Sequence, residues 1–269
     1  MPPRPDTPAR LPRPWIAIAT IGLFLWLDHF HLDLFRQLAG DWRGYPRLAA
    51  LAALAYVPQL LAVLGFAALL RGPRRALDAL GLDRSPLPAL AFGLAATAIL
   101  PLGFALSAGF APPERALLEV LRTALLPGFG EELLYRAFLF GILFRFAGWG
   151  FLPAALVGAS LFAAAHLYQS DAAAEAAAIF ALTGLGALWF AWLYAEWDYN
   201  LWVPVAFHAL MNMYWTLFSV SDTALGSATA NGLRLGVIGL SVAITLWLRR
   251  RRGGRTVQGR RWWGGAVHG

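Results

Sequence analysis

The sequence contains no cysteine and no lysine, and it has few charged residues of either sign. Without cysteine the chain forms no disulfide, offers no thiolate nucleophile and holds no metal through sulfur. Charged residues make up 14% of the 269 positions, whereas a typical soluble domain has about 25%. These absences exclude an ordinary soluble domain and every enzyme class that depends on a thiol.

Apolar residues take the place of the missing charges and fill 59% of the chain. A helix needs about 20 mainly apolar residues to cross the hydrocarbon core of a bilayer. Such runs predict membrane spans at residues 15–27 (a short one), 47–70, 87–110, 117–144, 151–169, 176–195, 200–220 and 231–248. We therefore expect an all-α fold, a polytopic membrane helix bundle of about eight transmembrane helices that forms one integral membrane domain over residues 1–269.

Arginine is concentrated in a basic, proline-rich N-terminal tail (1–14), in the stretch 71–84 and in a basic C-terminal tail (249–269). Loops on the cytoplasmic side of a membrane carry an excess of arginine and lysine. The pattern predicts a multi-pass protein of a bacterial cytoplasmic membrane with both termini cytoplasmic. Because the arginines follow the apolar runs in this way, we assign the net charge of +7 to membrane topology and expect no nucleic-acid partner.

Three charged residues interrupt the apolar run "PGFGEELLYRAFLFGIL" at 127–143, namely Glu131, Glu132 and Arg136. A charge at mid-bilayer costs on the order of 2.5–3.5 kcal/mol on insertion scales, so it normally faces the bundle interior and has a partner. Glu132 and Arg136 are four residues apart and can pair on one helix face. Glu131 is rotated by about 100° from Glu132 and lacks that partner. Pro127, Gly128 and Gly130 can break or kink the helix beside it and admit water or another backbone.

Two further polar pairs lie inside apolar spans. Phe162 and His166 share a face of the fifth span, and His208 and Asn212 share a face of the seventh. The other histidines, His29, His31 and His268, lie in polar segments and are expected to have no chemical role. A carboxylate and a neutral imidazole can activate a water molecule, while a second imidazole and an amide can donate to a developing oxyanion. The set predicts amide hydrolysis by water, without a serine or cysteine nucleophile.

The three segments "EELLYR" (131–136), "FAAAH" (162–166) and "HALMN" (208–212) match EExxxR, FxxxH and HxxxN in that order. On these residues the chain resembles the CPBP family of intramembrane glutamic proteases. That family includes the type II CaaX prenyl endopeptidases and the bacteriocin-processing or self-immunity proteins. The resemblance covers a motif-bearing core at about 115–215. Ala137 departs from the pattern, because many members have glycine there.

The resemblance implies a role for each motif residue. Glu131 is the general base and His166 its partner in activating water, His208 and Asn212 form the oxyanion site, and Glu132, Arg136 and Phe162 support the geometry. It also implies an eight-helix bundle and an endopeptidase with no metal and no cofactor. Its partners are the lipid bilayer and a membrane-associated peptide or protein, whether prenylated, lipid-anchored or a C-terminal sorting signal.

Several alternatives to this function stay open at the level of sequence. The charged residues could form a purely structural ion cluster. Glu131, His166 and His208 could ligate zinc in a membrane metalloprotease. The chain could also be a membrane immunity or scaffold protein without activity, or a transporter that uses its buried acids and histidines as a proton relay.

The predicted topology raises a question of depth. Counted from the cytoplasmic start of its span, His166 lies about 16 residues in, or roughly 24 Å at 1.5 Å per residue. That places His166 in the outer half of the membrane, whereas His208 lies nearer the middle. Either the predicted boundaries are displaced or the site is reached from outside.

Overall fold

The structure is a computed structural model that describes residues 11–251 and 253–264, apart from the side chains of residues 30–34 and 39. Parts of both predicted tails, His268 and the side chain of His31 thus lie outside the described residues. Helix accounts for 78% of the structure, and the described residues form no strand. The predicted all-α fold is confirmed.

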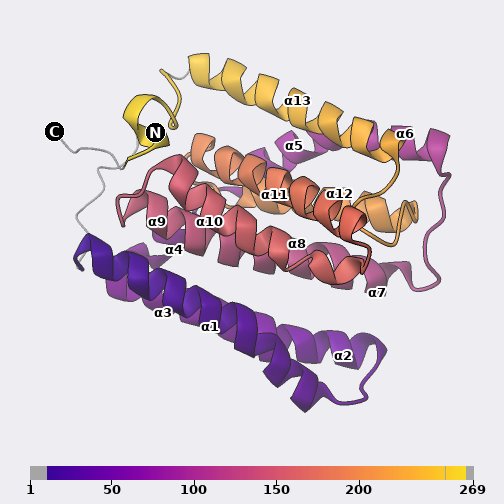
Figure 1. Ribbon diagram of the computed structural model, residues 1–269, viewed down its shortest axis with the longest axis horizontal. Coiled ribbons are helices and arrows are strands. Elements are labelled where there is room, and N and C mark those ends of the chain that lie inside the picture. The colour runs from indigo at the N-terminus through magenta and orange to yellow at the C-terminus, as the bar shows by residue number, and fades with distance from the viewer. Residues whose placement is uncertain (1–10, 252, 265–269) are drawn as a thin grey trace.

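The helices follow one another with short connections (Figure 1). Three stretches, η1, η3 and η4, are π-helical, and η2, η5 and η6 are 3-10 turns. The elements are α1 (Arg13–Ala39), α2 (Gly44–Leu51), η1 (Ala52–Tyr56), α3 (Val57–Arg71), η2 (Pro73–Arg75), α4 (Ala76–Leu80), α5 (Pro86–Thr97), α6 (Ile99–Ser107), α7 (Ala116–Val120), η3 (Leu121–Leu125), α8 (Leu126–Glu131), η4 (Glu132–Phe140), α9 (Gly141–Arg145), α10 (Phe151–Ala164), η5 (Leu167–Gln169), α11 (Ala173–Glu196), α12 (Trp202–Leu217), α13 (Ala228–Arg251) and η6 (Gly259–Trp262).

Five described helical segments are long and apolar enough to cross a membrane: Gly44–Arg71, Pro86–Ser107, Phe151–Gln169, Ala173–Glu196 and Ala228–Arg251. The predicted count of about eight spans is not confirmed. The segment from α7 to α9 carries the three central charges, and α12 has only 16 residues. The predicted span 15–27 is too short, because α1 has 27 residues and continues past Asp28.

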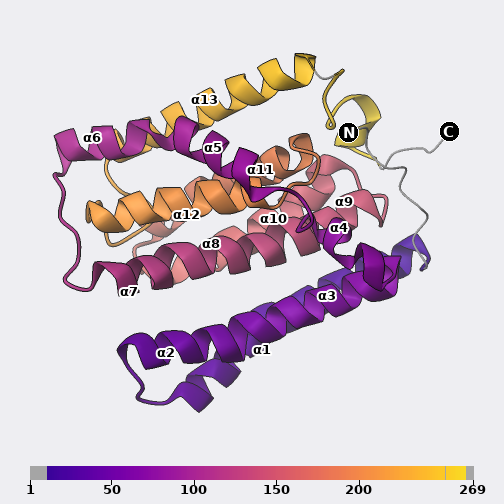
Figure 2. The ribbon, with the colours of Figure 1, turned by 180° about the vertical axis from the view of Figure 1, so that it is seen from behind.

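The helices run back and forth between two ends of the bundle (Figures 1 and 2). The connections 72–85, 146–150 and 197–201 lie together with the segment 253–264 at what we call the tail end. One hydrogen bond there runs from the Leu201 N–H to the Gly81 carbonyl, at 3.2 Å. The connections 40–43, 108–115, 165–172 and 218–227 lie at the opposite, loop end. There the Ala224 N–H donates to the Gln169 side chain at 2.7 Å.

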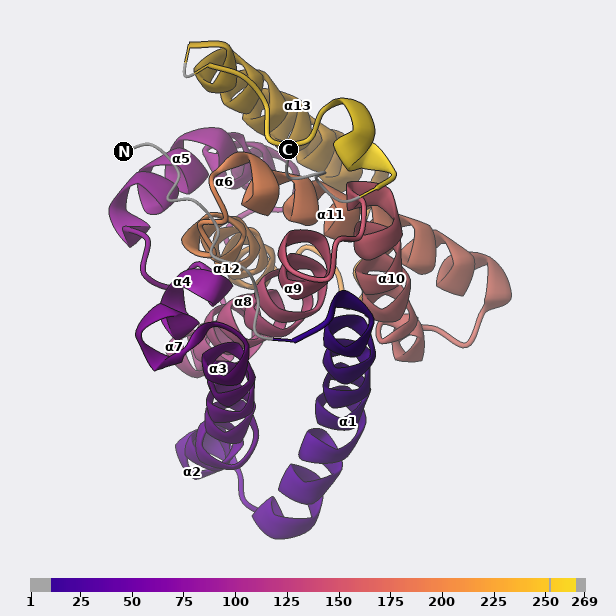
Figure 3. The ribbon, with the colours of Figure 1, turned by 90° about the vertical axis from the view of Figure 1, so that its left-hand side faces the viewer.

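The motif-bearing helix occupies the middle of the bundle. All nine residues of η4 are buried, and Figure 3 shows α8 and α9 surrounded by other helices. Burial of η4 follows from its sequence, because apolar side chains surround its two charged residues on every face. Large apolar residues such as Leu69, Leu87 and Leu106 are exposed on the outside, as expected where lipid is the solvent.

The sequence allowed a break or a kink near Glu131, and no break occurs, because helical structure continues from Ala116 to Arg145, with π-helical η3 and η4 on either side of α8. The two glycines instead allow close packing. A Cβ on Gly128 would lie 3.1 Å from the backbone nitrogen of Ala209 in α12, and one on Gly130 would overlap the Tyr56 ring. The sequence also predicted that another backbone could come close at these glycines, and the backbone of α12 does so at Gly128. Glu131 is held between α12 and the η1 segment.

We expect Gly130→Ala to lower the free energy of unfolding by about 1–3 kcal/mol, the usual cost of overpacking. Gly186→Ala is the matched control, because nothing lies within 4 Å of a Cβ at that position of α11. Thermal unfolding in detergent measures both. Equal effects of the two substitutions would show that Tyr56 does not confine Gly130.

Candidate active site

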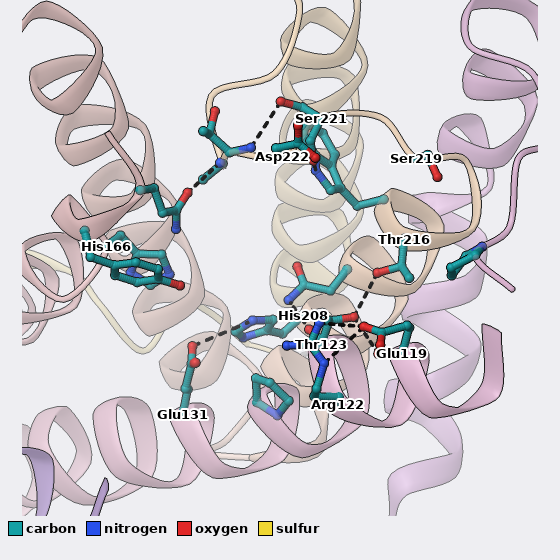
Figure 4. Close-up of a pocket in the computed structure, with 18 of the residues that line it drawn as sticks. Glu119, Arg122, Thr123, Glu131, His166, His208, Thr216, Ser219, Ser221 and Asp222 are labelled. Carbon is teal, nitrogen blue, oxygen red and sulfur yellow. Dashed lines mark hydrogen bonds and ion pairs between the residues drawn. The ribbon is translucent and has the colours of Figure 1, made fainter. Parts of the chain in front are cut away.

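A cavity of about 680 Å³ lies between the α7–α8 segment, α12 and the connections at the loop end. Four of the predicted site residues line it: Glu131, His166, His208 and Asn212. Figure 4 shows Glu131 and His208 on facing helices, with His166 to one side. Three sequence segments thus deliver polar groups to one space inside an apolar bundle.

Glu132 forms the buried centre of a charge network. Its side chain is fully buried, and Oε1 lies 3.0 Å from Nη1 of Arg136, so the pair expected from the four-residue spacing is present. The same oxygen accepts a hydrogen bond from Nδ1 of His208 at 2.7 Å. The Arg136 guanidinium also lies 4.4 Å from the centre of the Phe162 ring, which favours a cation over its face. The network joins η4, α10 and α12.

Glu131 has a different environment from its neighbour. Its side chain is 32% exposed, and Oε2 lies 3.9 Å from Nε2 of His208, beyond hydrogen-bond length. Besides the main cavity, it borders a second one of about 280 Å³. The carboxylate of Glu131 is therefore accessible to water. The sequence predicted such a carboxylate outside the Glu132–Arg136 pair.

His166 lies just after the end of α10, where Nδ1 is 2.8 Å from the carbonyl oxygen of Phe162. A carbonyl only accepts hydrogen bonds, so Nδ1 carries the proton. In the neutral ring, Nε2 then has a free lone pair. The Phe162 ring packs against the imidazole, with centroids 4.5 Å apart. This arrangement fixes both the tautomer and the orientation of His166.

His208 and Asn212 stand one turn apart on α12. Because Nδ1 of His208 donates to Glu132, Nε2 carries an N–H only when the ring is doubly protonated. The Asn212 amide donates one N–H to the Thr123 carbonyl at 3.0 Å and has a second to offer. Pro127, four residues after Thr123, has no N–H to donate to that carbonyl. The proline thus leaves an acceptor that anchors Asn212.

Sequence reasoning missed two contacts near Glu131. The Gln59 amide donates to the Gly130 carbonyl at 2.8 Å, and the Tyr135 hydroxyl donates to Asp28 at 2.8 Å. Gln59, Tyr135 and Asp28 line the second cavity with Glu131 and His166. The available signals were a polar residue within the run 47–70 and a carboxylate directly after the run 15–27. Asp28 falls just outside the predicted span 15–27, because that span ends before α1 does.

No three histidine, aspartate or glutamate side chains in the described part of the chain come together as a set that could hold a metal ion. Glu131, His166 and His208, the proposed zinc ligands, share the main cavity without forming such a set. Nδ1 of each histidine is already engaged, with the Phe162 carbonyl in one case and Glu132 in the other.

Comparison with known protein families gives a match over the motif-bearing core. Residues 113–214 match the family model described as type II CAAX prenyl endopeptidase Rce1-like. The matched region contains all three motifs and confirms the resemblance drawn from them. No curated protein and no solved structure matches the chain.

The buried pair of Glu132 and Arg136 should behave as one unit in a double-mutant cycle. Breaking a buried pair by removing one partner costs about 3–5 kcal/mol, so Glu132→Gln and Arg136→Gln should each be strongly destabilising. The double variant should be less destabilised than the sum of the two, because no unpaired charge remains. Thermal unfolding of the four proteins in detergent measures the coupling. Additive effects would refute a paired role.

Proposed function

Because the chain carries an Rce1-like domain at residues 113–214, we propose that it is an intramembrane endopeptidase that uses Glu131 to activate water. The family implies a membrane endopeptidase that acts on peptides. Our proposal adds the catalytic type, which is glutamate-dependent and needs no metal. It also adds that α1, the α7–α9 segment and α12 cross the membrane with the five apolar segments, giving eight spans.

The observation that supports this proposal best is the contrast between two adjacent carboxylates. Glu132 is fully buried and bound by Arg136 and His208, whereas Glu131 is partly exposed in a polar cavity. A purely structural ion cluster explains the burial and pairing of Glu132 but gives no role to Glu131. A hydrolytic site requires a carboxylate that can reach water and remain fixed in place, and Glu131 meets both conditions.

In the proposed reaction, a water molecule lies between Glu131 and His166. Nε2 of His166 accepts a hydrogen bond from the water and orients it, while Glu131 removes a proton as the water oxygen attacks the carbonyl carbon. The tetrahedral oxyanion then accepts hydrogen bonds from the free N–H of Asn212 and from Nε2–H of a doubly protonated His208. Glu131 returns the proton to the amine nitrogen, the C–N bond breaks, and a carboxylic acid and an amine leave.

Glu132 and Arg136 act through His208 in this scheme. Glu132 holds Nδ1 at 2.7 Å and so directs Nε2 toward Glu131 and the cavity. Arg136 balances the charge of Glu132 at 3.0 Å, and Phe162 packs against both Arg136 and His166. These three residues position the chemistry and do not touch the substrate.

Glu131→Gln should lower peptide cleavage at least about 100-fold, because an amide cannot serve as the general base. Glu114→Gln is the matched control, since Glu114 is exposed in the connection 108–115 and does not line the cavity. The measurement compares the termini of membrane and secreted proteins in host cells that carry wild type, Glu131→Gln or Glu114→Gln. A set of cuts absent only with Glu131→Gln supports the proposal.

Two results would redirect the assignment. Identical terminus profiles in all three strains, with the protein present, favour an immunity or scaffold protein. Loss of wild-type cleavage in a chelator, with recovery on adding zinc, favours the metalloprotease.

Asn212→Ala should lower kcat by about 10²–10³-fold, the usual cost of removing one oxyanion donor, with little change in KM. Thr183→Ala on α11 is the control, because its hydroxyl bonds the Ile179 carbonyl within the same helix. Kinetics with a peptide identified in the terminus comparison measures both parameters. A rise in KM with unchanged kcat would assign Asn212 to substrate binding.

A further inference from the structure

The cavity around Glu131 opens at only one end of the bundle as far as its described lining shows. Its rim is formed by residues of the loop end, including Pro113, Tyr168, Gln169, Ser221, Asp222 and Thr223. Its floor is formed by Glu131 and His208, from the middle parts of their helices. Connections of the tail end do not contribute to this lining. A peptide that enters through this opening therefore comes from the loop end.

Arginine is unequally divided between the two ends. The exposed arginines of the tail end include Arg74, Arg250, Arg251, Arg255 and Arg260. At the loop end, the connections 165–172 and 218–227 have no arginine and carry Asp171 and Asp222 instead. Because arginine-rich flanks stay on the cytoplasmic side during membrane insertion, this asymmetry orients the tail end toward the cytoplasm.

The connection 40–43 weakens the asymmetry without reversing it. Arg43 and the flanking Arg36 and Arg47 lie at the loop end, where Nη2 of Arg43 is 3.8 Å from Oδ1 of Asp41. The loop end also holds three further arginines, namely Arg115, Arg122 and Arg234. Against them stand the arginines of 72–85 and of the segment from Arg249 to Arg261, which are both more numerous and adjacent to apolar spans. The balance of the two ends still favours a cytoplasmic tail end.

The helix directions agree with this orientation. Both α10 and α12 begin at the tail end, and His166 lies two residues after the end of α10, at the loop end. His208 lies six residues after the start of α12, or roughly 9 Å along it. Glu131 and His208 therefore lie near the middle of the bundle, and the cavity opens at the end opposite the arginine-rich tail end. The predicted span 151–169 has the same bounds as the apolar helical segment Phe151–Gln169. His166 therefore remains near the end of its span that is far from the tail end.

We propose that the active-site cavity opens on the non-cytoplasmic side of the membrane, and that its substrate is a peptide segment of a membrane-associated protein exposed on that outer face. The part that concerns a substrate rests on the proposed function, whereas the orientation does not. A prenylated cytoplasmic tail is then not the substrate, because it would have to cross the membrane to reach Glu131.

The absence of cysteine makes the chain suited to a direct test, since every introduced thiol is the only one present. Tyr168→Cys and Ser221→Cys report the rim of the cavity, where Tyr168 is 85% exposed. Ser85→Cys reports an exposed site of the tail end and changes no charge. Intact cells and permeabilised cells are treated with a membrane-impermeant maleimide, and labelling of the purified protein is measured.

The two rim cysteines should be labelled in intact cells, and Ser85→Cys only after permeabilisation. Labelling of Ser85→Cys alone in intact cells, or of both ends, overturns the proposal. If a variant does not accumulate, fluorescence of a green fluorescent protein fused after Gly269 gives the same answer, because the fusion fluoresces only when the tail end is cytoplasmic. An unlit fusion that is present at full length overturns the proposal.

The labelling separates this inference from the proposed function. Suppose that the rim cysteines are labelled in intact cells and that Glu131→Gln leaves the terminus profiles unchanged. The proposed orientation would then stand and the proposed protease activity would be overturned. Cuts that depend on Glu131 but fall in cytoplasmic tails would keep the protease and overturn the orientation.

Discussion

The structure depends on the burial of one carboxylate. Glu132 is fully enclosed in a bundle where a lone charge is expensive, so it must have partners on other helical turns and on other helices. Arg136 supplies the first at 3.0 Å and His208 the second at 2.7 Å. Because His208 comes from α12, satisfying Glu132 also fixes the position of α12 against η4. The geometry of the candidate site thus follows from the need to pair the buried charge of Glu132.

Once that network is formed, the adjacent Glu131 is placed at an edge where it reaches water. Its backbone is confined by neighbours, with the Gly130 carbonyl accepting from Gln59 and Gly128 packed against Ala209. Its side chain remains 32% exposed. A fixed backbone with an accessible carboxylate suits a general base. The entropy cost of orienting the carboxylate is then met during folding and does not add to the barrier of the reaction.

Local spacing in the sequence was sufficient for the pairs within a helix. The four-residue steps from Glu132 to Arg136, from Phe162 to His166 and from His208 to Asn212 place each pair on one face in any helix, and the first two pairs are in contact. The third pair lies on the wall of one cavity. Such contacts depend only on the segment being helical, and the residue types of these segments predict a helix.

Contacts between helices were beyond the sequence. The bond between His208 and Glu132 joins residues 76 positions apart, and nothing in either segment shows that His208 faces Glu132 and not Glu131. The π-helical form of η4 also changes which residues face a neighbour, and periodicity of 3.6 does not reveal it. The break that Pro127 and the two glycines allowed is absent for a related reason. The acceptor freed at Thr123 is bound by Asn212, so the helix continues where an isolated one would open.

The proposed hydrolysis inside a bilayer requires both a buried charge network and a route for water, and the structure has the two at different depths. The Glu132 network lies where side chains exclude solvent, while the cavity rim includes serine, threonine, glutamine and aspartate side chains from the loop end. Fixed dipoles in the dry part act strongly on a developing oxyanion, and the polar rim lets water reach Glu131 without breaching the apolar exterior. The side of the membrane from which water enters is therefore also the side from which a polar peptide backbone can enter. Under the proposed function, the orientation of the bundle and the choice of substrate become one question, and the arginine distribution supports our proposal for both.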